Sequence, residues 1–187
     1  ATMRLANAPR LPFEFVGLAD NVSLYLSEIE TLADTMREET LANNARIDSG
    51  VYALALDPTR SLVAPLKKAE VPHFNFAPLK NALAELEQAA QEYAEHSRGA
   101  AAATERVNKL LYTSERELTR DDGLPGRPWF RHHIYAPGFY TGYGVKTLPG
   151  VREAIEERQY ELAEQEIHVA AEVIAGMARR IRELTAQ

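Results

Sequence analysis

Residues 123–150 read GLPGRPWFRHHIYAPGFYTGYGVKTLPG and separate the helix-forming parts of the chain. Glycine and proline recur along this segment, so we expect local turns rather than a helix or a strand ladder to shape its backbone. Loops of this length inside a compact domain are usually functional or disordered. The many aromatic side chains argue against disorder because they supply apolar area that disordered segments lack. We predict a long ordered aromatic loop before the last helix.

On either side of this loop, apolar residues recur at intervals of three and four, which is typical of amphipathic helices. The pattern predicts helices over residues 15–40, 78–98, 103–118 and 151–184. The short break between the second and third helices favours antiparallel neighbours. The sequence therefore predicts an all-α fold, a four-helix up-and-down bundle.

Residues 48–75 depart from this pattern and are interpreted as an excursion on the bundle. The run VYALAL at residues 51–56 is consistent with a short strand or a buried extended piece. Prolines at positions 58 and 65 then interrupt regular structure.

Composition limits the class of protein. The 187 residues suit one domain, with 45% hydrophobic residues and a net charge of −6. Without a basic face, binding to nucleic acid or to an anionic membrane is disfavoured. No apolar run approaches the roughly 20 residues that span a bilayer, so the chain is expected to be soluble. Cysteine is absent, which excludes disulfides and thiolate chemistry, and the sequon at Asn21 is interpreted as a chance match.

One helix face offers a candidate metal site. Glu164, His168 and Glu172 follow one another at four-residue steps, and a carboxylate, an imidazole and a carboxylate can hold a divalent ion. Carboxylate sites in bundles need Glu-x-x-His motifs on facing helices, and such a repeat is absent here. An exposed stripe of paired charges is the better interpretation, and we predict no metal site in this chain.

The adjacent His132 and His133 are candidates for an acid and a base. Neighbouring residues usually point in different directions, and an imidazole beside a buried aromatic is more often a hydrogen-bonded loop anchor, which we favour. Phosphate-binding, nucleophile-elbow and zinc-peptidase motifs are absent from the sequence. We therefore predict no catalytic residue.

Tyrosines in the loop provide a further possibility. Tyr135, Tyr140 and Tyr143, with Lys146 and Arg131, are able to surround an acidic ligand through phenol and guanidinium hydrogen bonds. Alternatively, their rings simply pack the loop onto the bundle. The residues alone leave both interpretations open.

The run LPGRPWFRHHIYAP at residues 124–137 closely resembles the C-terminal helical domain of glutamate carboxypeptidase II and its relatives, the transferrin receptor-like dimerisation domain. The resemblance extends through Tyr143 and the turn at residues 148–150 into the last helix. It also reaches back to residues 11–13, and it covers most of the chain apart from residues 48–75.

This resemblance implies that residues 1–187 form a single helical dimerisation domain, a fragment of a larger multidomain protein. The expected partners are a second copy of the chain and the protease and apical domains of the same parent. In the family, a separate protease domain carries two zinc ions, so no cofactor is expected in this chain. The loop at residues 123–150 is expected to help complete the substrate pocket of that domain. The parent is expected in the secretory pathway or vacuole, or anchored in a membrane with this domain on the lumenal or extracellular side.

The resemblance also assigns substrate-binding residues. Tyr143 stands where peptidase members have a tyrosine that hydrogen-bonds the terminal glutamate of the substrate. The preceding lysine of the glutamate-specific enzymes is Gly142 here, so glutamate specificity is not expected to be retained. Arg131 and Tyr135 complete the predicted set.

Three hypotheses follow. The first is a homodimerisation domain of a zinc-dependent, carboxypeptidase-like enzyme. The second is the same domain in a non-catalytic receptor or vacuolar sorting relative. The third is a free-standing enzyme with His132 or His133 as the base.

Overall fold

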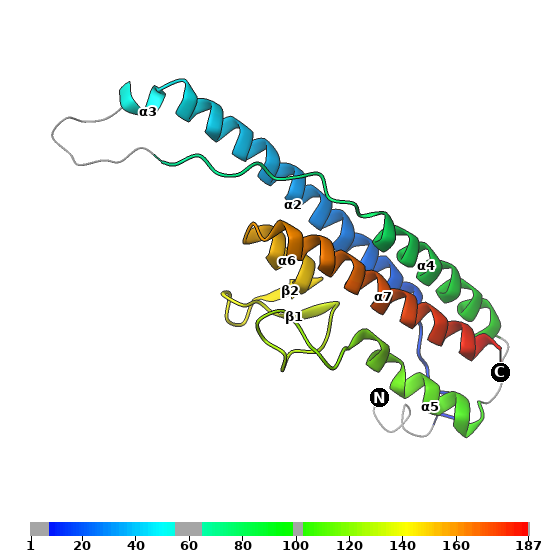
Figure 1. The fold of residues 1–187 in the computed structure, drawn as a ribbon. Coiled ribbons are helices and arrows are strands. Elements are labelled where there is room, and N and C mark those ends of the chain that lie inside the picture. Colours follow the sequence, from blue (N-terminus) through cyan, green and yellow to red (C-terminus); the bar gives the residue numbers. More distant parts are fainter. Residues whose placement is uncertain (1–7, 55–64, 99–102, 187) are drawn as a thin grey trace. The chain divides into compact units, whose positions relative to one another are not determined.

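The computed structural model describes residues 8–54, 65–98 and 103–186. It is mostly helical, which confirms the predicted all-α class (Figure 1). The chain divides into two compact units, one formed by Ala1–Ser27 with Asn75–Gln187 and the other by Glu28–Phe74. The four-helix up-and-down topology stays a prediction.

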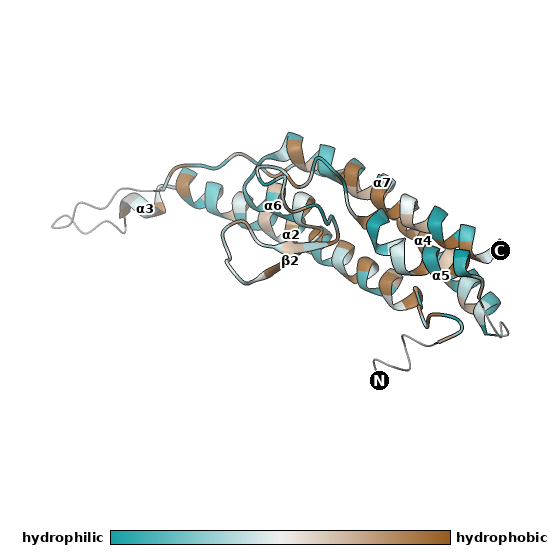
Figure 2. Ribbon diagram, turned by 90° about the horizontal axis from the view of Figure 1, so that it is seen from below, coloured by the Kyte–Doolittle hydropathy of each residue, from teal (hydrophilic) through white to brown (hydrophobic). Residues whose placement is uncertain are grey.

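The core of the larger unit lies between helices α4 (Ala77–Ser97) and α7 (Tyr160–Thr185), which lie side by side in Figure 1. Both helices alternate apolar and polar surface along their length, as Figure 2 shows by hydropathy. Fully buried side chains recur at seven-residue steps, about two helical turns. They are Leu79, Leu86 and Tyr93 on α4 and Ile167, Ile174 and Ile181 on α7. The second predicted helix is confirmed almost to the residue.

The N-terminal segment packs on the end of α4. The ring of Phe15 meets the ring of Tyr93 edge-on, with centroids 5.1 Å apart, and the guanidinium of Arg10 lies 5.5 Å from the Tyr93 centroid. The carbonyl of Pro9 accepts a hydrogen bond of 3.1 Å from the amide of Ala103. These contacts hold the chain just before α2 (Val16–Asp48), the long first helix, which extends beyond its predicted end at residue 40.

The third predicted helix is shorter than expected. Helix α5 spans Glu105–Thr113, and Thr104 caps it by accepting a hydrogen bond from the amide of Val107 at 3.2 Å. A 3₁₀ helix, η1 (Ser114–Leu118), continues the path, so the predicted single helix over 103–118 is wrong in its second half. Tighter 3₁₀ turns often end α-helices.

The last predicted helix is also divided. Helix α6 (Pro149–Glu156) ends at a turn in which Arg158 has φ +60°, and α7 begins two residues later. The prediction of one helix from residue 151 to 184 is therefore wrong. A left-handed residue reverses the local backbone direction, which lets α6 fold back against α7.

The smaller unit contains most of α2 and the extended residues 65–74. Arg37 donates to the carbonyl of Val71 at 3.1 Å, and Asn44 both donates to the carbonyl and accepts from the amide of Lys68. Val51–Leu54 form a short helix, α3, so the predicted strand or extended piece is wrong for these four residues. Residues 55–64 lie outside the described residues.

Candidate functional site

The segment at residues 123–150 folds into tight turns and a small hairpin rather than one continuous loop. Strand β1 (Tyr135–Pro137) pairs with β2 (Val145–Thr147) in antiparallel register, with Ala136 opposite Lys146. This strand pair corrects the expectation that no strand ladder would shape the segment. The hairpin presents the residues between its strands at its tip, residues 138–144.

A compact turn precedes the hairpin and depends on glycine. Leu124 donates its amide to the carbonyl of Phe130 at 2.8 Å, which closes a short loop over residues 124–130. Gly123 enters this loop with φ +66°, and a Cβ at that position would lie 2.3 Å from the carbonyl oxygen of Pro128. Only glycine fits both the backbone angle and the space.

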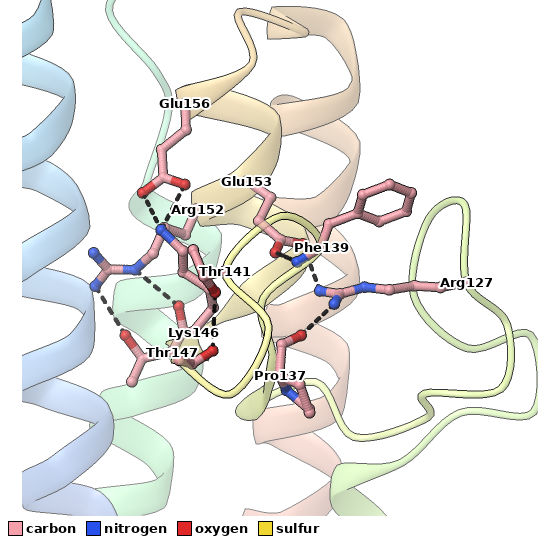
Figure 3. A network of polar contacts seen from close by, with 10 residues as sticks. Arg127, Pro137, Phe139, Thr141, Lys146, Thr147, Arg152, Glu153 and Glu156 are labelled. Carbon is pink, nitrogen blue, oxygen red and sulfur yellow. Dashed lines mark hydrogen bonds and ion pairs between the residues drawn. The ribbon is translucent and has the colours of Figure 1, made fainter.

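Arg127 joins this turn to the hairpin and to α6. Its side chain is almost completely buried and donates hydrogen bonds to the carbonyl of Pro137 and, at 2.5 Å, to the carboxylate of Glu153 (Figure 3). Glu153 also accepts the amide of Phe139 at 2.7 Å. The guanidinium lies over the rings of Phe130 and Phe139, at 5.4 and 5.7 Å from their centroids. This buried ion pair fixes the base of the hairpin.

Two further contacts fasten strand β2 to α6. Lys146 donates to both carboxylate oxygens of Glu156 at 2.8 Å. Arg152 donates to the carbonyl of Thr147 at 3.1 Å and to its hydroxyl at 2.8 Å (Figure 3). Because Lys146 is paired in this way, it does not stand free to replace a missing lysine at the tip.

The tip itself is exposed. Tyr143 has a relative exposure of 104%, and Tyr140 is also largely exposed. Gly142 has φ +59°, and no heavy atom lies within 4 Å of the position a Cβ would take. Backbone bonds from the amide of Gly138 to Gly144 and from the amide of Gly144 to Thr141 close the turn. The tip therefore offers an aromatic side chain that contributes no packing to the fold described here.

The four predicted substrate-binding residues are not joined into one cluster. Arg131 forms an exposed ion pair with Asp121 at 2.9 Å. The Tyr135 hydroxyl donates to Glu115 at 2.7 Å, and this hydrogen bond, with burial, raises the pKa of Tyr135. Among the described residues, no hydrogen bond or ion pair links either side chain to Tyr143 or Gly142.

The two histidines lie at the base of the hairpin. The Nδ1 atom of His132 accepts the amides of Ile134 and Tyr135 at 3.3 Å, and its ring lies 4.1 Å from that of Tyr135. His133 is buried. Burial lowers the pKa of both imidazoles. These contacts suit the predicted anchoring role rather than a base open to substrate.

The candidate metal face on α7 is engaged in other contacts. Glu164 accepts the amide of Asn75 at 3.3 Å, and Glu172 pairs with Arg120 at 2.9 Å. Within the described part of the chain, no group of three His, Asp or Glu side chains could hold a metal ion.

A cavity of about 290 Å³ lies behind the hairpin. Its wall comes from the turn after Gly123, from the start of the tip and from both sides of the α6–α7 turn; the lining includes Pro125, Phe139, Tyr140, Glu157 and Leu162. The arrangement does not bring together a nucleophile and a base. The cavity is therefore a space between the hairpin segment and the α6–α7 turn, without an assembled catalytic pair in its lining.

Sequence reasoning missed Arg127 and Glu153, whose ion pair holds the base of the hairpin. The signal that could have found them is the combination of an arginine inside a proline- and glycine-rich aromatic turn with an acidic residue on the following helix. An arginine in such a turn must pair if it is buried, because an unpaired buried charge is very costly.

In the residues that the structure describes, a mostly helical unit with an exposed aromatic hairpin and a buried ion pair at its base defines the class: a helical domain that displays an aromatic hairpin. Residues 74–182 match the transferrin receptor-like dimerisation domain, and the chain belongs to this family. The match includes the hairpin and both helices that hold it.

Curated relatives carry related names. The chain is 29% identical to the probable glutamate carboxypeptidase LAMP1 of Arabidopsis thaliana over 82% of the chain and 18% of that protein. It is 33% identical to a probable glutamate carboxypeptidase of Arthroderma benhamiae over 51% of the chain and 14% of that protein. With the probable glutamate carboxypeptidase VP8 of Zea mays it shares 25% identity over 90% of the chain and 20% of that protein. The chain thus spans one fifth or less of the length of these relatives.

Across the described residues, the structure has no helix with the length and apolar character that crossing a bilayer requires.

Proposed function

We propose that residues 1–187 form a single homodimerisation domain within a larger zinc-dependent peptidase of the glutamate carboxypeptidase type. The family match and the names of the relatives support this assignment. In the proposed parent, a protease domain carries two zinc ions, and the helices of this chain complete an up-and-down bundle that contacts a second copy. The parent enters the secretory pathway or vacuole, or is anchored in a membrane.

The loop at residues 123–150 contributes to the substrate pocket of that protease domain. The observation that supports this role is the full exposure of Tyr143 at the tip of a hairpin whose base is fixed by a buried ion pair. An exposed aromatic residue on a loop with a fixed base is well suited to meet a substrate, because the backbone loses little conformational entropy on binding. Arg131 and Tyr135 contribute when their guanidinium and hydroxyl groups exchange their present partners, Asp121 and Glu115, for the substrate.

Gly142 sets the specificity of this pocket. Without a lysine at this position, a substrate carboxylate loses a charge-assisted contact. The peptidase therefore accepts substrates whose terminal residue is not glutamate.

The pocket role is tested in the full-length parent. Tyr143→Ala should lower kcat/KM at least tenfold, about 1.4 kcal/mol of transition-state binding, and Gly142→Lys should raise the preference for a terminal glutamate. Tyr112→Ala, a change of an exposed tyrosine on α5, serves as the matched control and should leave both values unchanged. Equal effects of the two tyrosine variants would contradict the pocket role.

The dimer role is tested by light scattering of the purified chain over a concentration series. A mass near twice 20.9 kDa is expected. A strictly monomeric chain at all concentrations would mean that these helices do not hold the contact by themselves.

The alternative function is the same domain in a non-catalytic receptor or vacuolar sorting relative. The exposed tip favours a binding role in either case, because an aromatic loop is able to recognise a partner without catalysis. Peptidase activity of the full-length parent with added zinc separates the two. Turnover by the isolated chain would instead support an enzyme that uses His132 or His133.

A further inference from the structure

A buried carboxyl group lies where α6 meets α7. Glu166, on α7, has a relative exposure of only 8%. A Cβ on residue 150, at the start of α6, would lie 2.1 Å from its Oε2 atom. The carboxyl group therefore occupies space that only glycine leaves open, and among the described residues no hydrogen bond reaches it.

The charged groups near Glu166 do not neutralise the negative charge that its carboxylate would carry when ionised. From the segment after η1, Asp122 and Arg120 act on it, the first repelling and the second attracting. Arg120 is already shared between Asp122, at 3.2 Å, and Glu172, at 2.9 Å. The same two charges, on Arg120 and Asp122, also act on the pKa of His133.

The charged side chains of helix α6 are engaged elsewhere: Arg152 donates to Thr147, Glu153 is bound by Arg127, and Glu156 is bound by Lys146. Gly150 is the residue of α6 in contact with Glu166. The N-terminal end of a helix favours an anion, but no amide of α6 donates a hydrogen bond to Glu166 in the described structure. Burial, followed by the repulsion of Asp122, raises the pKa of Glu166 to about 7.

We propose that Glu166 is a proton-dependent latch: the neutral carboxylic acid lets α6 and residues 119–133 pack closely on α7, and ionisation loosens them. The hairpin follows, since Glu153 on α6 holds Arg127 and the amide of Phe139. Through this carboxyl group, the tip is held more tightly when Glu166 is neutral than when it is ionised. This inference goes beyond the proposed function and holds whether or not the parent is a peptidase.

The sign of the effect follows from linkage. The pKa of Glu166 is raised on folding, so the folded state holds its proton more tightly, and stability falls as pH rises from the unfolded to the folded value. His132 and His133 act in the opposite direction, because burial lowers the pKa of both imidazoles and folding weakens as pH falls through their range. Glu166→Gln retains both histidines, so a comparison with this variant isolates the contribution of the carboxyl group.

The first test reads the group directly by a carbon-13 NMR titration of the Glu166 carboxyl in the unmodified chain. A midpoint near 7 is expected. A midpoint in the ordinary range of a glutamate, about 4 to 5, overturns the proposal. This measurement needs no variant and so does not depend on whether a variant folds.

The second test reads the consequence with Glu166→Gln, which keeps the shape of a protonated carboxyl. Between about pH 6 and pH 8 the unfolding constant of the wild type should rise about tenfold relative to that of the variant. Amide exchange in residues 119–133 and 148–156, corrected for intrinsic rates, should rise over the same interval only in the wild type.

The matched control is Glu161→Gln, which removes an exposed carboxylate from the same helix. It should leave the wild-type dependence between these pH values in place. If Glu166→Gln and Glu161→Gln gave the same pH dependence, the latch would be refuted.

Discussion

The buried pair of Arg127 and Glu153 should dominate the stability of the hairpin, and Arg127→Met tests it. Methionine retains most of the apolar stem but removes the charge and its donors. The variant leaves Glu153 without its cation and leaves the carbonyl of Pro137 without its guanidinium donor. The two aromatic rings lose a cation but keep a neighbour that can pack against them.

The magnitude follows from these contacts. A hydrogen bond to a charged group contributes about 1.5–3 kcal/mol, and a neutral one about 1 kcal/mol. Breaking a buried ion pair by removing one partner costs about 3–5 kcal/mol because a charge is left uncompensated. Glu153 keeps the amide of Phe139 and some solvent access, so we expect the lower end, a loss of about 3 kcal/mol in the free energy of unfolding.

Urea unfolding of the wild type and variant measures this loss. The double variant Arg127→Met with Glu153→Gln removes the uncompensated charge as well and should recover about 1 kcal/mol or more of it. Arg131→Met is the matched control, since the ion pair of Arg131 with Asp121 is exposed, and it should leave the unfolding midpoint unchanged. A loss below about 1 kcal/mol for Arg127→Met would refute the view that this pair anchors the hairpin.

Three further changes have definite expected outcomes. Gly123→Ala should destabilise the chain by at least about 2 kcal/mol in urea unfolding, because the new Cβ meets the Pro128 carbonyl at a left-handed backbone angle; Gly142→Ala, with a similar angle but open space, should cost only about 1 kcal/mol. Thr104→Ala should cost about 1 kcal/mol through loss of the α5 cap and should raise amide exchange at Val107, and an unchanged exchange rate would contradict the capping role. Tyr143→Ala should leave the thermal midpoint of the isolated chain unchanged, since this side chain is exposed, whereas a clear fall would mean that it packs in the fold.

The long helices were predictable because burial on one side imposes a regular spacing. Leu79, Leu86 and Tyr93 lie two turns apart, and each is fully buried. Such a pattern needs no knowledge of the partner helix, since any core on that side selects the same positions. The class of the fold follows from this spacing alone.

The division between α6 and α7 was not predictable in this way. The turn at residues 157–159 contains neither glycine nor proline, and its left-handed residue is Arg158. Apolar spacing continues on both sides of the turn, so a single helix explains the sequence equally well. Tertiary packing decides between one helix and two. Folding α6 back buries Val151, Ala154 and Ile155, and the free energy gained by this burial outweighs the strain at Arg158.

The candidate site was likewise predictable only in part, because its main contacts are tertiary. Aromatic and glycine content marked residues 123–150 as the region of interest, and the resemblance indicated Tyr143. The pairing of Arg127 with Glu153 joins residues 26 positions apart, and a one-dimensional pattern does not indicate which of several acidic residues an arginine reaches. Lys146 illustrates the point, because its partner Glu156 takes it away from the tip that its sequence position suggested.

The tip and the base of the hairpin differ in burial, so substitutions at the two ends should have different effects. At the base, buried charges and backbone bonds fix the strands, so a substitution there should lower stability. At the tip, Tyr143 makes no packing contribution, so under the proposed pocket role its substitution should change binding alone. A partner that docks on Tyr143 meets an already ordered loop and avoids the entropy cost of forming it. A variant at each end therefore separates the energy that builds the loop from the energy that the loop contributes to recognition.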